Sequence, residues 1–195
     1  MKDKHMDNTE RDIIQSTIKA YAAKGLKFKM DDISADLGIS KKTIYIYFTG
    51  KAELCEKVVE YIFDMIAQAK GEALRLPDKT DAQYINKLKK YLTAMPEGLE
   101  QVNLAGLAEL KEKYPKLYKA VRRRLESNWE PAIELLEEGK RRGIIRYDAD
   151  FDLFRMMMEE STAAFFERDI LKKTGLEYTE ALGRVVEILT QGIIS

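Results

Sequence analysis

The sequence predicts an all-helical fold, and three observations support this prediction. Apolar residues recur at intervals of three and four in almost every segment, which is the spacing of one helix face. Glycine or proline stands where these periodic segments stop, as at helix ends. No segment alternates convincingly between apolar and polar residues, so no strand is expected. We expect about nine helices, arranged as a small unit over residues 1–51 and a larger one over residues 52–195.

The composition excludes several classes of protein. The chain has 195 residues, of which 45% are hydrophobic and 34% are charged, as in an ordinary globular protein. It has no apolar run of membrane-spanning length and no apolar segment after its charged start, so we expect a cytoplasmic protein without a membrane partner. The single Cys55 excludes an intrachain disulfide, and the single His5 has no ligand partners at metal-site spacing. We therefore expect neither metal nor cofactor.

The first three expected helices form a compact motif. Thr9, followed three residues later by Asp12, resembles a capping box that opens a helix over residues 9–24. Two short helical patterns then follow, separated by Gly38, and Ser40 is placed to cap the second of them. Two short helices joined by a glycine turn are the layout of a helix-turn-helix.

The second short helix carries polar and aromatic residues near its N-terminal end, where such a helix meets base edges and phosphates in the major groove of DNA. They are Lys41, Lys42, Thr43, Tyr45 and Tyr47. Tyr45 also adjoins Ile44, so a place in the core is the other interpretation of that residue. The net charge of zero splits into +3 for residues 1–51 (10 basic against 7 acidic residues) and −3 for the remainder, which weakly favours a nucleic-acid partner.

The larger unit is expected to begin with a long helix from residue 52, so that the two units are joined by a helix instead of a flexible linker. Helical patterns follow over residues 81–95, 99–114 and 115–142, and Pro131 predicts a kink or break near Trp129 in the last of these. After an extended piece at 144–147, Asp148 or Asp150 can cap a helix through residue 173. A final helix is expected over residues 178–194.

Two sets of residues in the larger unit are candidates for binding. Small or apolar side chains on the last two helices are typical of a close helix–helix interface between two subunits, and the alternative is that they face their own core. These candidates for a dimer interface are Ser161, Ala164, Leu182, Val185, Val186 and Leu189. Aromatic and methionine side chains are candidates for a ligand pocket, although such residues at helical spacing are more often plain core: Phe63, Trp129, Met157, Met158 and Phe165.

No catalytic pattern is present. The segment Thr49-Gly50-Lys51 lacks both the first glycine and the hydroxyl residue of a phosphate loop, and no nucleophile has an evident base. An enzyme is therefore not expected. A DNA-bound adaptor, whose second unit binds a protein instead of a small molecule, is the alternative to a ligand-controlled regulator.

Residues 25–54 resemble the DNA-binding signature of the TetR family of bacterial transcriptional repressors. The resemblance includes Gly25 after the first helix, the D-I-x-x-x-L-G-I-S hinge, the K-T-I-Y-x-Y-F helix and the K-x-E-L that opens the next helix. Lys29 stands where a threonine commonly caps the second helix in this family, Ser34 where alanine is usual, and Gly50 where serine or asparagine is common.

The resemblance implies a homodimeric repressor that binds a palindromic double-stranded DNA operator and is released by a small-molecule effector of unknown identity. It implies that Lys42 and Thr43 face bases and that Lys41 reaches bases or backbone. Tyr45, Tyr47 and Lys51 would hold phosphates, and Lys29 would join them.

Overall fold

A computed structural model describes residues 7–96, 107–167 and 170–195. Within these ranges the chain forms eleven α-helices and one short 3-10 helix, so the predicted all-helical fold is confirmed. The number exceeds nine because the segment predicted as one helix over 115–142 is two helices, and because a separate short helix follows the long helix that begins at Phe151. The helix predicted over 99–114 is described only in part, because its residues 99–106 lie outside the described residues.

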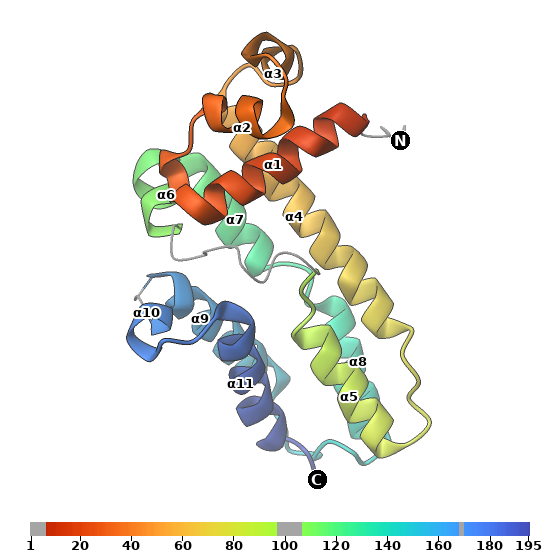
Figure 1. The fold of residues 1–195 in the computed structure, drawn as a ribbon. Coiled ribbons are helices and arrows are strands. Elements are labelled where there is room, and N and C mark those ends of the chain that lie inside the picture. Colours follow the sequence, from red (N-terminus) through yellow and green to blue (C-terminus); the bar gives the residue numbers. More distant parts are fainter. Residues whose placement is uncertain (1–6, 97–106, 168–169) are drawn as a thin grey trace.

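The N-terminal end of the molecule contains α1 (Asn8–Lys24), the 3-10 helix η1 (Gly25–Lys27), α2 (Met30–Leu37) and α3 (Lys41–Tyr47) (Figure 1). The cap of α1 is Asp7, whose carboxylate accepts the Thr9 N–H at 3.3 Å, and not Thr9 as the sequence suggested. Gly38 ends α2 in the left-handed conformation, with φ 63° and ψ 26°, which glycine adopts without steric cost. The predicted hinge is therefore present.

Helix α4 (Lys51–Leu74) begins beside the N-terminal helices and extends toward the opposite end of the molecule (Figure 1). There it reaches α5 (Asp81–Leu92), which lies beside α8 (Glu130–Arg141). Helices α6 (Leu107–Lys113) and α7 (Pro115–Leu125) lie closer to the N-terminal helices. The predicted break occurs between α7 and α8, with Pro131 in the first turn of α8, where its missing N–H costs no hydrogen bond.

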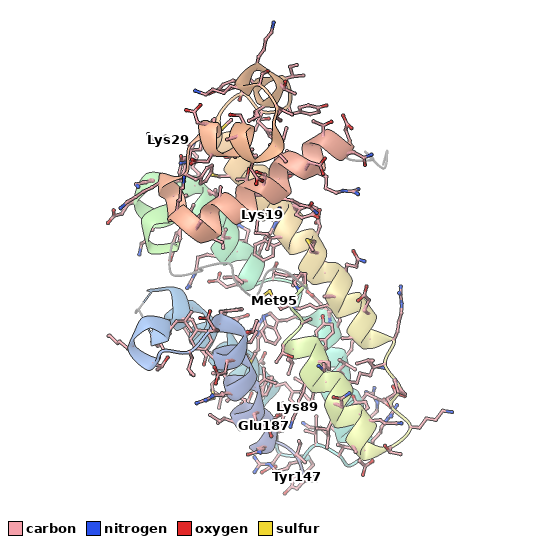
Figure 2. All side chains as sticks on the ribbon, viewed as in Figure 1. Lys19, Lys29, Lys89, Met95, Tyr147 and Glu187 are labelled. Atoms are coloured by element: carbon pink, nitrogen blue, oxygen red, sulfur yellow. The ribbon has the colours of Figure 1, made fainter. Side chains whose placement is uncertain are left out.

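The C-terminal part consists of α9 (Phe151–Glu167), α10 (Ile170–Thr174) and α11 (Tyr178–Gln191). Asp150 caps α9 by accepting the Leu153 N–H at 2.9 Å. The predicted extended piece is present, because Ile145 forms an antiparallel bridge with Ile194. Figure 2 shows Lys89 of α5 near Glu187 of α11, and their 2.6 Å ion pair joins these two helices.

One apolar core runs through the whole described chain, from Ile13 in α1 to Ile193 after α11. Its members come from both of the expected units, so α4 joins two parts that share buried contacts. No helix in the described ranges is long and apolar enough to cross a membrane.

Candidate DNA-binding site and ligand cavity

Helix α3 is the most outlying part of the N-terminal end (Figure 1). Its start is fixed by Ser40, whose hydroxyl accepts the Thr43 N–H at 3.1 Å. Ile44 and Phe48 are buried beneath it and hold it against the rest of the unit. The opposite face, which carries Lys42 and Tyr45, is turned to solvent, and Tyr45 is 50% exposed. The alternative place for Tyr45 in the core is therefore not what the structure shows.

Two polar residues at the start of α3 have local partners. The hydroxyl groups of Thr43 and Ser40 are 2.9 Å apart, which orients the Thr43 hydroxyl. The Lys41 ammonium lies 2.6 Å from the Asp31 carboxylate, and this hydrogen bond raises the pKa of Lys41. Both side chains are exposed, and exposed ion pairs contribute little to stability. A DNA phosphate can therefore replace Asp31 at small cost.

Tyr47, at the end of α3, donates its hydroxyl to the Asp7 carboxylate at 2.7 Å. This hydrogen bond lowers the pKa of Asp7 and raises that of Tyr47. Because Asp7 also caps α1, the contact connects α3 to the start of α1. A phosphate can take this hydroxyl only if Asp7 releases it.

The start of α2 is capped without the threonine that is common in the family. Asp32 accepts the backbone N–H of Lys29 at 2.7 Å and the ammonium of Lys24 at 2.7 Å. The hydrogen bond from Lys24 is the main cause of the lowered pKa of Asp32, followed by the bond from Lys29. The Lys29 side chain takes no part in the cap, and Figure 2 shows it at the surface of the N-terminal end.

Lys51 forms hydrogen bonds within the protein that the sequence did not indicate. Its ammonium donates to the carbonyls of Leu26 at 2.6 Å and Phe28 at 2.5 Å, and it lies 3.9 Å from the centroid of the Phe28 ring. Burial lowers the pKa of Lys51. Lys51 thus joins the start of α4 to the segment between α1 and α2.

Sequence reasoning missed Ile46, which is 74% exposed in the middle of α3. The signal was present in the helical spacing, because Ile44 and Phe48 face the core and Ile46 lies about 200° around the helix from either of them. A large apolar side chain on the exposed face of a recognition helix is suited to contact with thymine methyl groups.

An apolar cavity of about 130 Å³ lies between the N-terminal unit and the larger part of the chain. Its walls come from α1, the residues around η1, α4, α6, α7 and the start of α11. Among the described residues, no charged side chain lines it, and the polar side-chain groups are the hydroxyls of Thr17, Tyr21 and Tyr178 and the thiol of Cys55. Burial raises the pKa of Cys55 to about 11 and that of Tyr178 to about 12, so both stay neutral at physiological pH.

Of the residues proposed for a ligand pocket, Phe63 lines this cavity. Phe165 is buried behind it and packs edge-on against Tyr178, at 6.0 Å between ring centroids. Met158 is buried in the core, and Met157 on the same helix is 46% exposed. Trp129 lies in a separate, open groove between α8 and the start of α9, lined by acidic and basic residues.

The residues proposed for a dimer interface differ in how deeply they are buried. Leu182 and Val186 are buried in the chain's own core, so they are not available to a second subunit. Ser161, Ala164, Val185 and Leu189 are partly buried. The apolar side chains that α9 and α11 expose are instead Leu153, Met156, Met157 and Ile188. Among the described residues, no group of acidic, histidine and cysteine side chains is arranged to hold a metal ion.

Known proteins share these features with the chain. Residues 13–58 match the family described as bacterial regulatory proteins of the tetR family. These residues contain all of α2 and α3 and the start of α4. A curated relative, the uncharacterized HTH-type transcriptional regulator YvaF of Bacillus subtilis, is 29% identical over 184 residues, which are 94% of this chain and 95% of that protein.

Solved structures share the fold over nearly the whole chain. The fatty acid degradation regulator FadR of Bacillus halodurans aligns with a TM-score of 0.70 at 21% identity, over 97% of this chain and 98% of FadR. The ketosteroid transcriptional regulator KstR2 of Mycobacterium tuberculosis aligns with a TM-score of 0.60 at 15% identity, over 98% and 97%. Together, the matched helix-turn-helix, the relative of nearly equal length and the shared fold make this chain similar to DNA-binding transcriptional regulators of the TetR family.

Proposed function

We propose that the protein is a homodimeric repressor that binds a palindromic operator and is released by a small-molecule effector. The observation that supports operator binding is the exposed face of α3, where Lys42, Tyr45 and Ile46 lie above a buried Ile44. In this proposal Lys42, Thr43 and Ile46 contact bases. Lys29, Lys41, Tyr45 and Tyr47 contact phosphates, which set register and salt dependence but not sequence.

The effector is proposed to enter the apolar cavity. Thr17, Leu26 and Phe28 of the N-terminal unit line one side of it, and residues of α4 and α7 line the other. A molecule that widens the cavity would therefore shift α1 relative to α4. Leu26 and Phe28 also provide the carbonyls that hold Lys51, so the shift would reach the start of α4. Two recognition helices would then lose the spacing that adjacent half-sites require.

Dimerisation is proposed through α9 and α11, because one helix-turn-helix reads only a few base pairs and a two-fold pair reads two half-sites. The exposed Leu153, Met157 and Ile188 lie on these helices. The cavity favours a small-molecule effector over the alternative adaptor, which would need an exposed surface for a protein and no internal cavity.

Base reading is tested with a duplex that the purified protein selects from a random-sequence library. Thr43→Ala and Ile46→Ala are each expected to cost about 1 to 3 kcal/mol on the selected duplex and little on random DNA, because base contacts carry the discrimination. Tyr147→Ala is the control, since Figure 2 shows Tyr147 at the end of the molecule away from α3. Equal losses on both duplexes would remove these two residues from base reading.

A further inference from the structure

The apolar cavity has two ends of different character. Along α4 it extends from Cys55, near the N-terminal unit, to Ile66, a distance of roughly 16 Å at 1.5 Å per residue. At the Cys55 end, the nearby ammonium of Lys51 is already held by two backbone carbonyls. At the Ile66 end, α4 continues for one further turn to Lys70.

Lys70 is a lysine without an ion-pair partner among the described residues. Its side chain is partly buried, and its ammonium lies 5.2 Å from the centroid of the Tyr91 ring. Burial lowers the pKa of Lys70, as expected for an ammonium removed from water without a counter-ion.

Lys70 is close in sequence to residues that line the cavity. Lys70 follows Ile66 by four residues on α4, and Met95 follows Tyr91 by four residues in the chain. Both Ile66 and Met95 line the cavity. Figure 2 shows Met95 near the middle of the molecule, at the level where the N-terminal helices give way to the remaining helices. Lys70 therefore lies beyond the Ile66 end of the cavity, on the part of α4 that extends away from the DNA-binding helices.

A second cation lies on the same end. The guanidinium of Arg124 is 5.4 Å from the centroid of the Phe63 ring, which lines the cavity one helical turn before Ile66. The carboxylates of Glu130 and Glu134 act electrostatically on Tyr91, and both of these side chains line the open groove. Two cations, Lys70 and Arg124, thus flank the apolar wall at this end of the cavity.

We propose that the effector is an amphipathic organic anion, with an uncharged apolar portion in the cavity between α1, α4 and α7 and a single anionic group at Lys70. This inference rests on the proposed function, because it names the ligand class of the same cavity. The volume of about 130 Å³ is close to that of engineered apolar cavities that bind benzene. The apolar portion is therefore a short chain or a ring, and a longer chain requires the cavity walls to move.

The test compares three molecules with one apolar chain and different head groups: octanoate, octan-1-ol and octylammonium. Affinity for the purified full chain is measured by calorimetry without DNA. We expect octanoate to bind at least about tenfold more tightly than the alcohol, and the ammonium compound to bind most weakly, because only the carboxylate gains a charge-assisted contact. Binding should also raise the melting temperature of the protein.

Three variants assign the contacts. Lys70→Met keeps the apolar stem and removes the charge, so it should abolish the preference for octanoate over the alcohol, and Lys70→Arg should retain it. Lys90→Met is the matched control, because Lys90 is an exposed lysine on α5 next to Tyr91. Val59→Phe, which adds bulk at a residue lining the cavity, should weaken octanoate and octan-1-ol alike.

Any of three results would overturn the proposal: no binding of octanoate, equal binding of octanoate and the alcohol by the unaltered protein, or a preference that survives Lys70→Met in a folded variant. Circular dichroism establishes that each variant is folded. Octanoate that binds through Lys70 but leaves operator affinity unchanged would support the ligand class and refute effector release, so the two proposals fail separately.

Discussion

Lys51 and Lys41 illustrate how two lysines of the same N-terminal unit have different surroundings. The Lys51 ammonium is held by the carbonyls of Leu26 and Phe28, and both of these residues are buried. Lys41 is exposed at the start of α3 and is proposed to contact phosphate. A phosphate contact changes the salt dependence of DNA binding, whereas a contact within the protein changes stability. The two functions can therefore be separated by measurement.

Lys51→Met is expected to lower the free energy of unfolding by about 1 to 3 kcal/mol, because two carbonyls lose a charged donor. It should leave the slope of log affinity against log salt unchanged. Lys41→Met, the matched variant, is expected to lower that slope by about one unit with little change in stability, since the exposed ion pair of Lys41 with Asp31 contributes little. Denaturant unfolding and DNA titrations at several salt concentrations give both quantities. If Lys51→Met lowered the slope by one unit, Lys51 would bind phosphate, as the family resemblance implies.

At the scale of elements, α8 packs closely against Ile145 and against Tyr84 of α5 at Gly139. A Cβ atom built there would lie 2.7 Å from Cδ1 of Ile145 and 3.0 Å from Cε1 of Tyr84. Tyr84 is itself fixed, because it is buried and donates its hydroxyl to the Leu135 carbonyl. Ile145 is held by its bridge to Ile194. The absence of a side chain at Gly139 therefore permits the packing of α5, α8 and the chain terminus.

Gly139→Ala is expected to destabilise the protein by about 1 to 3 kcal/mol, because the added methyl group overpacks a buried contact. Thermal unfolding measures this loss. Gly71→Ala is the control, since nothing lies within 4 Å of a Cβ built at Gly71 in α4. That substitution should be neutral or stabilising by up to about 1 kcal/mol, because alanine favours helix more than glycine does. Equal stability of the two variants would show that Ile145 moves aside without cost.

At the scale of the whole molecule, DNA and effector are proposed to act at different places that share α4. The core is continuous across the expected boundary at residues 51 and 52, and the cavity takes walls from both sides. The two units are thus better described as a proposed DNA-binding part and a proposed effector-binding part that have one common hydrophobic core. A repressor with this arrangement needs a second subunit to occupy two half-sites.

Ile188→Glu is expected to convert the proposed dimer to a folded monomer with weak operator binding, because Ile188 is 68% exposed and a buried carboxylate is costly at an interface. Val186→Glu is expected to unfold the protein instead, since Val186 is 1% exposed within the core. Light scattering and circular dichroism distinguish the two outcomes. An Ile188→Glu protein that remains dimeric would place the interface elsewhere.

Much of the local structure followed from residue order. The ends of α1 and α2, the Gly38 turn, the Ser40 cap and the break before α8 were all predicted, because caps, glycine and proline act on their immediate neighbours. The cap of α1 was the exception: Asp7 and Thr9 are both suitable cap residues, and the sequence does not rank them.

The sequence by itself determined an all-helical chain with a DNA-reading motif, since helical periodicity and capping are local properties. Only the tertiary structure decided which apolar residues of α11 are core. Val186 and Ile188 are both β-branched apolar residues, and they differ in which side of the helix faces the core. The same holds for Lys51 and Lys70. Their partners lie 23 to 25 and 21 residues away in the chain, and contacts across such distances depend on how the helices pack.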